Sequence, residues 1–377
     1  EEQFEMVQYV EKGRKPRWGY FPKEGHPQAV TRFDGTRITP GFLQAIAYEV
    51  YVKNVTFGLL HQWLGDMGMT VSENTLRNWL KKGRKYLDRM VVELKRIALE
   101  KDAVVNCDET WCKVRKYDRY KKCYMWVLVN KAERVVIFFY EDGSRGRDVL
   151  TNFLGDAELK ALMSDGYNAY VFIGDGLKTH RYKDTDHQVC LAHVRAKFVK
   201  ARMEGGDKRA DVFLDNINRL FRFEREYDRE MITDGERTRR RQGLPTMEAM
   251  INLRANLLQE LKSEEEHKSS YMREALNYLH KFWNEAFTYI KDGRYPISNN
   301  LAERAVRPFT TKRKNSLHFG SDEGAEIAAV YHSIISTVKL QGRSAWDYLG
   351  KFFTGIFNGC RDFLSLTPQN IDLAVCQ

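Results

Sequence analysis

Five short apolar runs between residues 103 and 193 constrain the fold of this chain more than any other feature. In order they are "AVVNCD", "KCYMWVLVN", "RVVIFFY", "ALMSDG" and "HQVCLAH". Runs of this length, bounded by polar turn residues, are typical of buried strands, whereas the flanking segments repeat their apolar residues with a helical period. "GRDVLTNFLG" predicts a helix between the third and fourth runs, and "VRAKFVKARM" predicts one after the fifth. This order predicts an α/β fold around a mixed five-stranded sheet with flanking helices.

The segments around the sheet predict the domain organisation. Residues 199–295 are strongly charged and helix-periodic with a single proline, Pro245, which indicates a long helical insertion. Its middle, "GERTRRRQGLP", is expected to form an exposed basic bend. The expected parts are an extended basic arm at 1–39, a helical domain at 40–100, the first part of the sheet domain at 101–198, the insertion at 199–295, the second part of the sheet domain at 296–345 and a helical tail at 346–377.

The charge balance favours a polyanionic partner. Lys and Arg outnumber Asp and Glu by 61 to 51 in 377 residues, and the pI is about 9.1. This balance suits nucleic acid or an anionic membrane surface. No apolar run in the sequence approaches the roughly 18 residues of a membrane-spanning helix, and the six cysteines form no C-x-x-C pair. A reducing cytoplasm is therefore the expected setting.

The segment "TFGLLHQWLGDMGMTVSENTLRNWLKKGRKYL" predicts a helix, a tight glycine turn and a second helix. Ser72 is the expected N-cap of the second helix, and Leu76, Trp79 and Leu80 form its buried face. The outer face is basic, which predicts a helix-turn-helix DNA-binding domain. An ordinary helical hairpin with a solvated basic face is the alternative. The candidate DNA contacts on this helix are Asn74, Arg77 and Lys81.

Two aspartates end apolar runs that lie far apart in the sequence. Asp108 closes the first run and Asp165 the fourth. Acids at such places are costly to bury without a cation or donors, although Asp also caps strand ends and Asp-Gly turns routinely. If these two strands are neighbours, both carboxylates meet at one edge and suit Mg²⁺ or Mn²⁺. Two such ions can activate a water or hydroxyl and stabilise the leaving oxygen at a phosphodiester.

A third acid, Glu303, lies in the basic stretch "PISNNLAERAVRPFTTKRKN". Asn300 and Glu303 fit a capping box, and Glu303 and Arg307 are spaced i, i+4, so a purely structural role is the alternative. We expect a short helix, ended by Pro308, that points Glu303 at the two aspartates. The rival acids of the next helix, Glu323 and Glu326, are expected to be solvated or structural. Candidate phosphate contacts in the stretch are Arg304, Arg307, Lys312, Arg313 and Lys314.

The motif "CLAHVRAKF" follows the fifth strand candidate. Cys190 and His193 have C-x-x-H spacing without a second pair, so a buried Cys and a hydrogen-bonded His are favoured over zinc. His193, Arg195 and Lys197 open a helix, where backbone N–H groups and cations can bind phosphate. The chain contains neither a G-x-S-x-G motif nor a P-loop.

Four stretches together resemble the IS66-type insertion-sequence transposases. They are the helical region from "TPGFLQAIAYEVYV" to "TLRNWL", the "CDETW" and "SDGYNAY" segments, "CLAHVRAKF", and the stretch from "NNLAERAVRPF" to "STVKLQG". The resemblance runs from about Thr39 to Gly342. It departs from the family pattern at Trp111, Leu191 and Ala196, and residues 1–38 lack the cysteines of the family's zinc-binding segment.

The resemblance implies a DDE transposase with an RNase H-like catalytic core interrupted by the helical insertion. Asp108, Asp165 and Glu303 would then be catalytic and hold divalent ions, Mg²⁺ or Mn²⁺ and two in number. The expected partners are the DNA ends of the element, the target DNA, a second copy of the chain and accessory proteins of the same element. The alternatives are an inactive, domesticated relative and a helix-turn-helix regulator, in which the three acids need not converge.

Overall fold

The computed structural model describes residues 4–9, 17–22, 38–175, 181–263 and 268–372. The chain forms two compact units. One comprises Glu1–Met90 and Gln341–Gln377, and the other comprises Val91–Leu340. Among the described residues, every helix is too short or too polar to cross a membrane.

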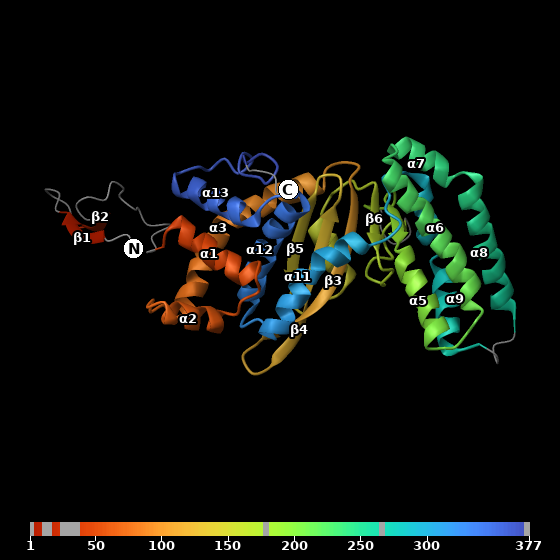
Figure 1. Cartoon of the computed structure of the whole chain (residues 1–377), viewed down its shortest axis with the longest axis horizontal. Coiled ribbons are helices and arrows are strands. Elements are labelled where there is room, and N and C mark those ends of the chain that lie inside the picture. Colours follow the sequence, from red (N-terminus) through yellow and green to blue (C-terminus); the bar gives the residue numbers. More distant parts are fainter. Residues whose placement is uncertain (1–3, 10–16, 23–37, 176–180, 264–267, 373–377) are drawn as a thin grey trace. The chain divides into compact units, whose positions relative to one another are not determined.

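The larger unit is built on the predicted five-stranded sheet (Figure 1). Its strands are β3 (Val104–Arg115), β4 (Tyr120–Asn130), β5 (Val135–Glu141), β6 (Ala161–Ser164) and β7 (Asp186–Val189). They lie in the order β5-β4-β3-β6-β7. β3, β4 and β5 pair antiparallel, whereas β6 pairs parallel with both β3 and β7. The first and fourth strand candidates are therefore neighbours, and the mixed sheet is confirmed.

The expectation that Asp108 closes its strand is wrong. β3 continues to Arg115, because residues 109–115 stay paired with β4 down to the register Arg115↔Tyr120. The parallel partner β6 stops much earlier, at Ser164. Asp108 thus lies within a long strand, at the level where its β6 neighbour has just ended.

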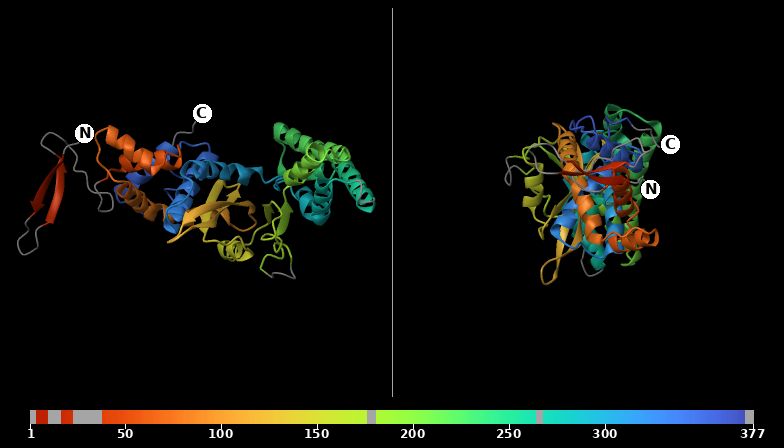
Figure 2. Two further views of the ribbon diagram at one scale, coloured as in Figure 1. Left: turned by 90° about the horizontal axis from the view of Figure 1, so that it is seen from below. Right: turned by 90° about the vertical axis from the view of Figure 1, so that its left-hand side faces the viewer.

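Two helices cover one face of the sheet (Figures 1 and 2). α11 (Asn300–Ser316) lies on β3 and β4, and α12 (Asp322–Leu340) lies on β5. Ala302, Val306 and Phe309 of α11 are buried against this face of the sheet. Burying the two larger side chains, Val306 and Phe309, contributes roughly 1.5–3 kcal/mol each.

This packing explains why the predicted end of the Glu303 helix is wrong. α11 passes through Pro308 and ends only at Ser316. Proline removes one backbone hydrogen bond and clashes with the preceding turn, at a cost of about 3 kcal/mol. Because the apolar stripe continues on both sides of Pro308, with Val306 and Phe309 both buried, tertiary packing offsets that cost.

Hydroxyl groups of α12 complete the hydrogen bonding of the edge strand β5. Ser333 Oγ accepts from the N–H of Phe138 (2.8 Å), and Thr337 Oγ1 accepts from the N–H of Val136 (3.0 Å). Both hydroxyls are buried. The helix therefore covers a sheet edge that would otherwise present unpaired backbone groups.

The opposite face of the sheet is covered by α4 (Arg147–Leu154) (Figure 2). Phe153 of α4 stacks on Phe139 of β5 with ring centroids 3.8 Å apart. Trp126 of β4 also lies on this face, beside Tyr170.

Residues 199–295 contain helices and no strand among their described residues, as predicted. Four of the helices, α5, α6, α8 and α9, pack into a bundle (Figures 1 and 2). Its interior includes the stacked rings of Phe198 and Phe213, 4.4 Å apart. Two short elements, α10 and η3, contact the edge strand β7. The helices are α5 (Leu191–Met203), α6 (Ala210–Glu230), α7 (Asp234–Arg241), α8 (Leu244–Lys262), α9 (Ser270–Lys281), α10 (Trp283–Phe287) and the 3₁₀ helix η3 (Thr288–Lys291).

The predicted exposed basic bend is instead the helix α7, and its arginines pair with acids of the insertion. Arg239 and Arg240 bind Glu236, which lies in the same helix. Arg241 is 2% exposed and donates to both carboxylate oxygens of Glu224 (2.8 and 2.7 Å) and to two backbone carbonyls. Arg241 therefore stabilises the interior of the insertion, whereas Arg239 remains 77% exposed.

We expect Arg241→Ala to destabilise the protein by about 3–5 kcal/mol, because Glu224 would remain buried with one of its charge partners gone. Arg239→Ala is the matched control on the same helix. Its side chain is 77% exposed, so its pair is worth about 0–1 kcal/mol. Chemical denaturation of the two variants measures the difference, and equal unfolding midpoints would contradict this account.

Among the described residues of the smaller unit, the regular elements are helices and the two strands β1 (Phe4–Tyr9) and β2 (Arg17–Pro22), which pair antiparallel within the predicted extended arm. Lys12, Arg14 and Lys15 of that arm lie outside the described residues. Threonines 39 and 56 cap α1 and α2, and Ser72 accepts from the N–H of Thr75 at the start of α3. In the predicted tail, α13 packs on α1. The helices are α1 (Pro40–Tyr51), α2 (Phe57–Asp66), α3 (Glu73–Ala98) and α13 (Ala345–Phe357).

Candidate active site

The sheet register brings Asp108 and Asp165 side by side. β3 and β6 pair in parallel as far as Asn106↔Met163. Continued by two residues, this register sets Asp108 opposite Asp165, the first residue after β6. Each carboxylate accepts a backbone N–H at 2.9 Å, from Glu109 and Tyr167 respectively. The two acids therefore meet at one edge, as the sequence predicts.

A glycine turn fixes the backbone after Asp165. Gly166 has φ +79°, a conformation that favours glycine. A Cβ at Gly166 would meet the hydroxyl oxygen of Tyr278 at 2.8 Å. That hydroxyl donates to the Asp165 carbonyl at 2.5 Å. The insertion helix α9, which carries Tyr278, thus helps to position the second aspartate.

Glu303 lies in the first turn of α11, close enough for its charge to act on Asp108. Burial raises the pKa of Asp108 to about 8, and the charge of Glu109 adds to the shift. The carboxylates of Asp165 and Glu303 raise the same pKa further. Like charges gathered in a partly buried site disfavour ionisation until a cation joins them. Asp165 and Glu303 are therefore near enough for their charges to act on Asp108, and three carboxylates would offer the oxygen ligands that suit Mg²⁺ or Mn²⁺.

The rival acids lie elsewhere on the surface. Glu323 and Glu326 are exposed residues of α12. The charge of Glu303 is among the main causes that raise the pKa of Asp108, whereas the charges of Glu323 and Glu326 are not. Of the three glutamates, Glu303 is therefore the one whose charge is seen to act on Asp108.

A buried asparagine, Asn299, joins the segments that carry these acids. Its side chain is 0% exposed; Nδ2 donates to the carbonyl of Cys107 (2.9 Å), and Oδ1 accepts from Asn106 Nδ2 (2.9 Å). Its backbone N–H donates to Cys190 Sγ (3.1 Å). Its carbonyl accepts from the N–H of Glu303 (3.1 Å).

Asn299 takes the place of strand β6 beside β3. Alternate carbonyls of a strand point to the same side. The carbonyl of Ala103 accepts from the N–H of Lys160, just before β6. The carbonyl of Cys107, four residues later, therefore also faces the side of β6. Since β6 has ended at this level, the Cys107 carbonyl accepts from Asn299 instead. The capping box expected of Asn300 is wrong, because α11 begins at Asn300 and the preceding N-cap residue uses its side chain for this contact.

A comparison with protein families assigns the chain to one of them. The sequence matches the model of the transposase IS66 family over residues 35–327. The chain belongs to the IS66 transposase family. The match covers more than half of the chain and includes Asp108, Asp165 and Glu303.

Proteins similar to this family member include three from Sinorhizobium fredii (strain NBRC 101917 / NGR234). It is 25% identical to the uncharacterized protein y4jD over 350 residues, covering 88% of this chain and 65% of that protein. It is 28% identical to the uncharacterized protein y4qI over 239 residues, which cover 63% of this chain and 43% of that protein. It is 25% identical to the uncharacterized protein y4hP over 252 residues, which cover 62% of this chain and 44% of that protein. The chain thus spans less than two thirds of each of these relatives.

The C-x-x-H motif of this transposase family member lies beside Glu303. His193 Nδ1 is 3.8 Å from Glu303 Oε1, and the ligand atoms of Cys190, His193 and Glu303 lie within 4.8 Å of one another. Burial raises the pKa of the Cys190 thiol to about 11, so the neutral thiol serves as a hydrogen-bond acceptor. The prediction that His193 is hydrogen-bonded is wrong for its Nδ1 atom, which has no hydrogen-bond partner within the described part of the chain.

The five cations after Glu303 do not share one role. Arg304, Arg307 and Lys314 are exposed. Lys312 is 6% exposed on the buried side of α11, and burial lowers its pKa well below the usual value, so the predicted contact of Lys312 with DNA is wrong for this conformation. The guanidinium of Arg313 binds the Trp111 carbonyl at 2.6 Å and lies 4.1 Å from the centre of the Trp111 ring.

The cations that follow His193 have partners within the insertion. Arg195 donates to Asn218 Oδ1 (2.7 Å), and Lys197 pairs with Glu274 at 2.5 Å. Their charges are therefore engaged by α6 and α9. Of the three predicted phosphate contacts on α5, His193 is the one that lies beside the acids.

In the smaller unit, Asn74, Arg77 and Lys81 all lie on the exposed side of α3, as predicted. Arg77 pairs with Glu73 (2.6 Å) and its guanidinium lies 4.6 Å from the centre of the Phe57 ring. Leu76 and Leu80 are buried on the other side. The helix thus separates an apolar face from a polar one.

Sequence reasoning missed Glu109, which lies beside Asp108 on the other face of β3. Its carboxylate is 1% exposed and pairs with Arg145. The hydroxyl of Tyr170 donates to it as well. The alternation of side chains along a strand was the available signal, because adjacent acids on a buried strand must face opposite sides.

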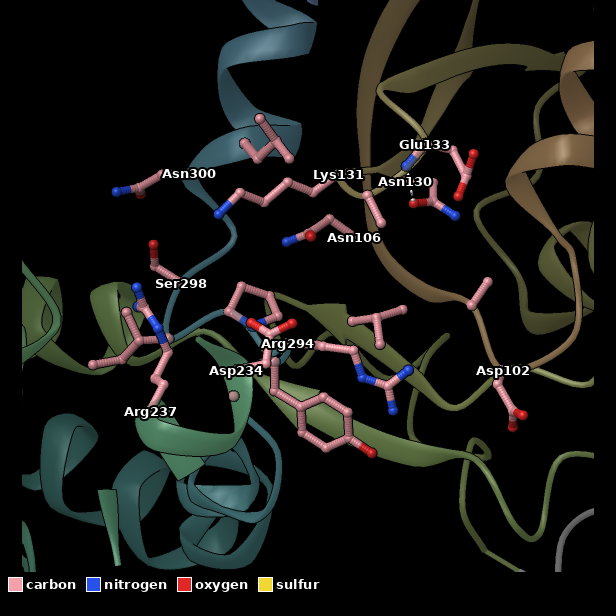
Figure 3. A pocket seen from close by; sticks show the side chains of 18 of the residues that line it. Asp102, Asn106, Asn130, Lys131, Glu133, Asp234, Arg237, Arg294, Ser298 and Asn300 are labelled. Atoms are coloured by element: carbon pink, nitrogen blue, oxygen red, sulfur yellow. Dashed lines mark hydrogen bonds between the residues drawn. The ribbon is translucent and has the colours of Figure 1, made fainter. Parts of the chain in front are cut away.

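A cavity of about 600 Å³ lies between the sheet and the insertion (Figure 3). Asn106, Lys131 and Ser298 border it on the side of the sheet and α11, and Asp234 and Arg237 border it on the side of α7. Six acidic and six basic side chains line it. Because these charges balance, the cavity itself indicates no anionic ligand.

Asn299→Ala should destabilise the larger unit, because it leaves the buried Cys107 carbonyl and the Asn106 amide without partners at about 1–3 kcal/mol each. Asn300→Ala is the matched control, since Asn300 is the next residue and is exposed. Denaturation curves and amide hydrogen exchange at β3 provide the measurement. Equal stability of the two variants would show that the hydrogen bonds of the Asn299 side chain do not stabilise the larger unit.

Stability should depend on pH and on Mg²⁺ through Asp108. Its pKa rises from 3.8 to about 8 on folding, so the folded state holds a proton that the unfolded state releases, and the free energy of unfolding falls as pH rises from about 4 to 8. Mg²⁺ needs the ionised carboxylate, so its stabilisation should be larger at pH 8 than at pH 5. At 100 times Kd it amounts to about 2.7 kcal/mol.

Thermal melts with and without Mg²⁺ at the two pH values test this expectation, and Asp108→Asn should remove most of both effects. An Mg²⁺ response of the same size in Asp108→Asn would place the ion elsewhere.

Proposed function

We propose that this protein is a DDE transposase that binds the ends of an insertion sequence, hydrolyses DNA at their 3′ ends and joins those ends to target DNA. The single observation that carries the proposal is the position of Asp165 and Glu303 near Asp108: the strand register sets Asp165 beside it, and the charges of both acids raise its pKa. A helix-turn-helix regulator has no need of such a cluster, so its occurrence in an IS66 family member supports the enzyme.

The sheet order supports an RNase H-like catalytic core. Three antiparallel strands followed by two parallel ones place the first acid on β3 and the second after β6. The third acid comes from α11, after the helical insertion. This is the arrangement that the resemblance to DDE transposases implies.

Asp108, Asp165 and Glu303 would hold two Mg²⁺ ions, with Mn²⁺ as a substitute. Such ions supply an activated water or hydroxyl and stabilisation of the leaving oxygen. The role of the three carboxylates is to bind and orient. The exposed cations Arg304 and Arg307 would hold DNA phosphates beside them.

We propose that the exposed face of α3 binds the DNA at the element ends. Asn74, Arg77 and Lys81 would lie in the major groove, as in helix-turn-helix proteins. We further propose that the protein acts on DNA as a homodimer with accessory proteins of the same element, in the bacterial cytoplasm at the nucleoid. A domesticated relative that has lost catalysis remains the alternative function, and the three acids support the active form.

Glu303→Gln should abolish both end cleavage and strand transfer while folding and DNA binding persist, because it keeps the shape of the side chain and removes the charge that a divalent ion needs. Glu326→Gln is the control on α12. The assay incubates the protein with the terminal DNA of its element and Mg²⁺ or Mn²⁺ and follows nicking at the 3′ ends. Full activity of Glu303→Gln with loss in Glu326→Gln would show that the third acid is the other glutamate.

Arg77→Ala should weaken binding to the element ends. A lost phosphate contact lowers the slope of log K against log[salt] by about one unit, whereas a lost base contact relaxes specificity at one position. Arg89→Ala, an exposed arginine further along the same helix, is the control and should bind normally. Unchanged binding by Arg77→Ala in a salt titration would assign α3 a structural role.

A further inference from the structure

A groove of about 460 Å³ begins two residues after Asp165. It lies between the turn at 145–147 and the segment 167–172. Its charged lining residues are Arg145 and Arg147, and its described lining includes no acid. The lining of the groove is therefore positively charged, whereas the acidic and basic residues that line the cavity of Figure 3 are equal in number.

One wall of the groove is an aromatic ring held in a fixed position. The guanidinium of Arg145 lies 3.7 Å from the centre of the Tyr167 ring. Arg145 is itself anchored to the buried Glu109, with its Nε donating to Oε1 at 2.6 Å. The backbone N–H of Tyr167 donates to Asp165. The backbone of Tyr167 is thus bound to the catalytic candidate Asp165, and its ring packs on an arginine that is anchored to the interior behind Asp108.

The rim of the groove carries cations that remain available to an anion. Arg147, the first residue of α4, is exposed and forms no ion pair with the described residues. Lys281 of α9 is also exposed and donates to Asn168 Oδ1 at 3.5 Å. The guanidinium fork of arginine matches phosphate geometry, so Arg147 is the better placed of the two to bind one phosphate.

We infer that this groove binds one unpaired nucleotide next to the cleaved phosphate, with its base on Tyr167 and its phosphate on Arg147. The inference rests on the proposed function and adds to it the path of one DNA strand. An aromatic ring with adjacent cations is how proteins hold unpaired nucleotides without reading their sequence. A base inside a duplex cannot reach such a ring, so the nucleotide must leave the stack.

Abasic substrates test the contact between Tyr167 and a base. The cleavage rate, as kcat/KM, is measured on terminal duplexes that carry a single abasic nucleotide in turn at each position around the cleaved phosphate. Tyr167→Leu should lower kcat/KM roughly tenfold on intact DNA, the effect of one lost stacking contact. This loss should vanish at one abasic position and persist at the others. Tyr167→Phe keeps the ring and should retain the wild-type rate.

A neutral methylphosphonate linkage tests the phosphate contact in the same way. Arg147→Gln should lower kcat/KM roughly tenfold and the salt slope by about one unit, and both losses should vanish when that one phosphate is neutral. Tyr117→Leu and Arg222→Gln are matched controls, since both residues are exposed and lie outside the groove. Both controls should behave as wild type.

The outcomes separate the two proposals. Wild-type protein that cuts no terminal DNA with Mg²⁺ or Mn²⁺ overturns the proposed function. Cleavage that is indifferent to Tyr167→Leu and Arg147→Gln, or equally impaired at every abasic position, overturns the groove and leaves the transposase standing. If melting shows that Tyr167→Leu does not fold, Arg147→Gln on the methylphosphonate series decides the inference alone.

Discussion

The hydrogen bonds of Asn299 are the constraint on which the candidate site depends. β3 and β6 part just where Asp108 and Asp165 face each other, which leaves the Cys107 carbonyl buried without a strand partner. An unpaired buried carbonyl is costly, and the Asn299 amide satisfies it. Because Asn299 is also the residue before α11, the same contact fixes where that helix starts and hence where Glu303 lies. Through its side chain and its backbone, this one buried residue thus connects β3, Cys190 and the start of α11.

Two adjacent acids of β3 have different environments because a strand alternates its faces. Glu109 faces the side of α4, where Arg145 and Tyr170 bind it. Asp108 faces the side of α11, where further carboxylates raise its pKa and no cation among the described residues pairs with it. This unpaired state is the reason why we propose Asp108, and not its paired neighbour Glu109, as a ligand of a divalent ion.

The positive charge of the chain is distributed unevenly between folding and surface. Arginines of α7 pair with acids of the insertion, and Lys312 is buried in the sheet domain. The cations that remain exposed near the acids come from the start of α11 and from the groove beside Tyr167. The net charge is therefore a poor guide to where a polyanion could bind, because several of the counted cations are buried or already form ion pairs within the fold.

The sequence by itself determined the strands, the insertion, the three acids and the family resemblance, because hydrophobic period and short motifs are local properties. It failed at Pro308, at Lys312 and at the arginines of α7, where packing and ion pairing outweigh local preference. Only the tertiary structure decided that Asn299 replaces a strand beside Cys107, that Glu109 turns away from Asp108, and that Tyr167 and Arg147 share one groove. Each of these depends on contacts between residues far apart in the chain, which no local pattern encodes.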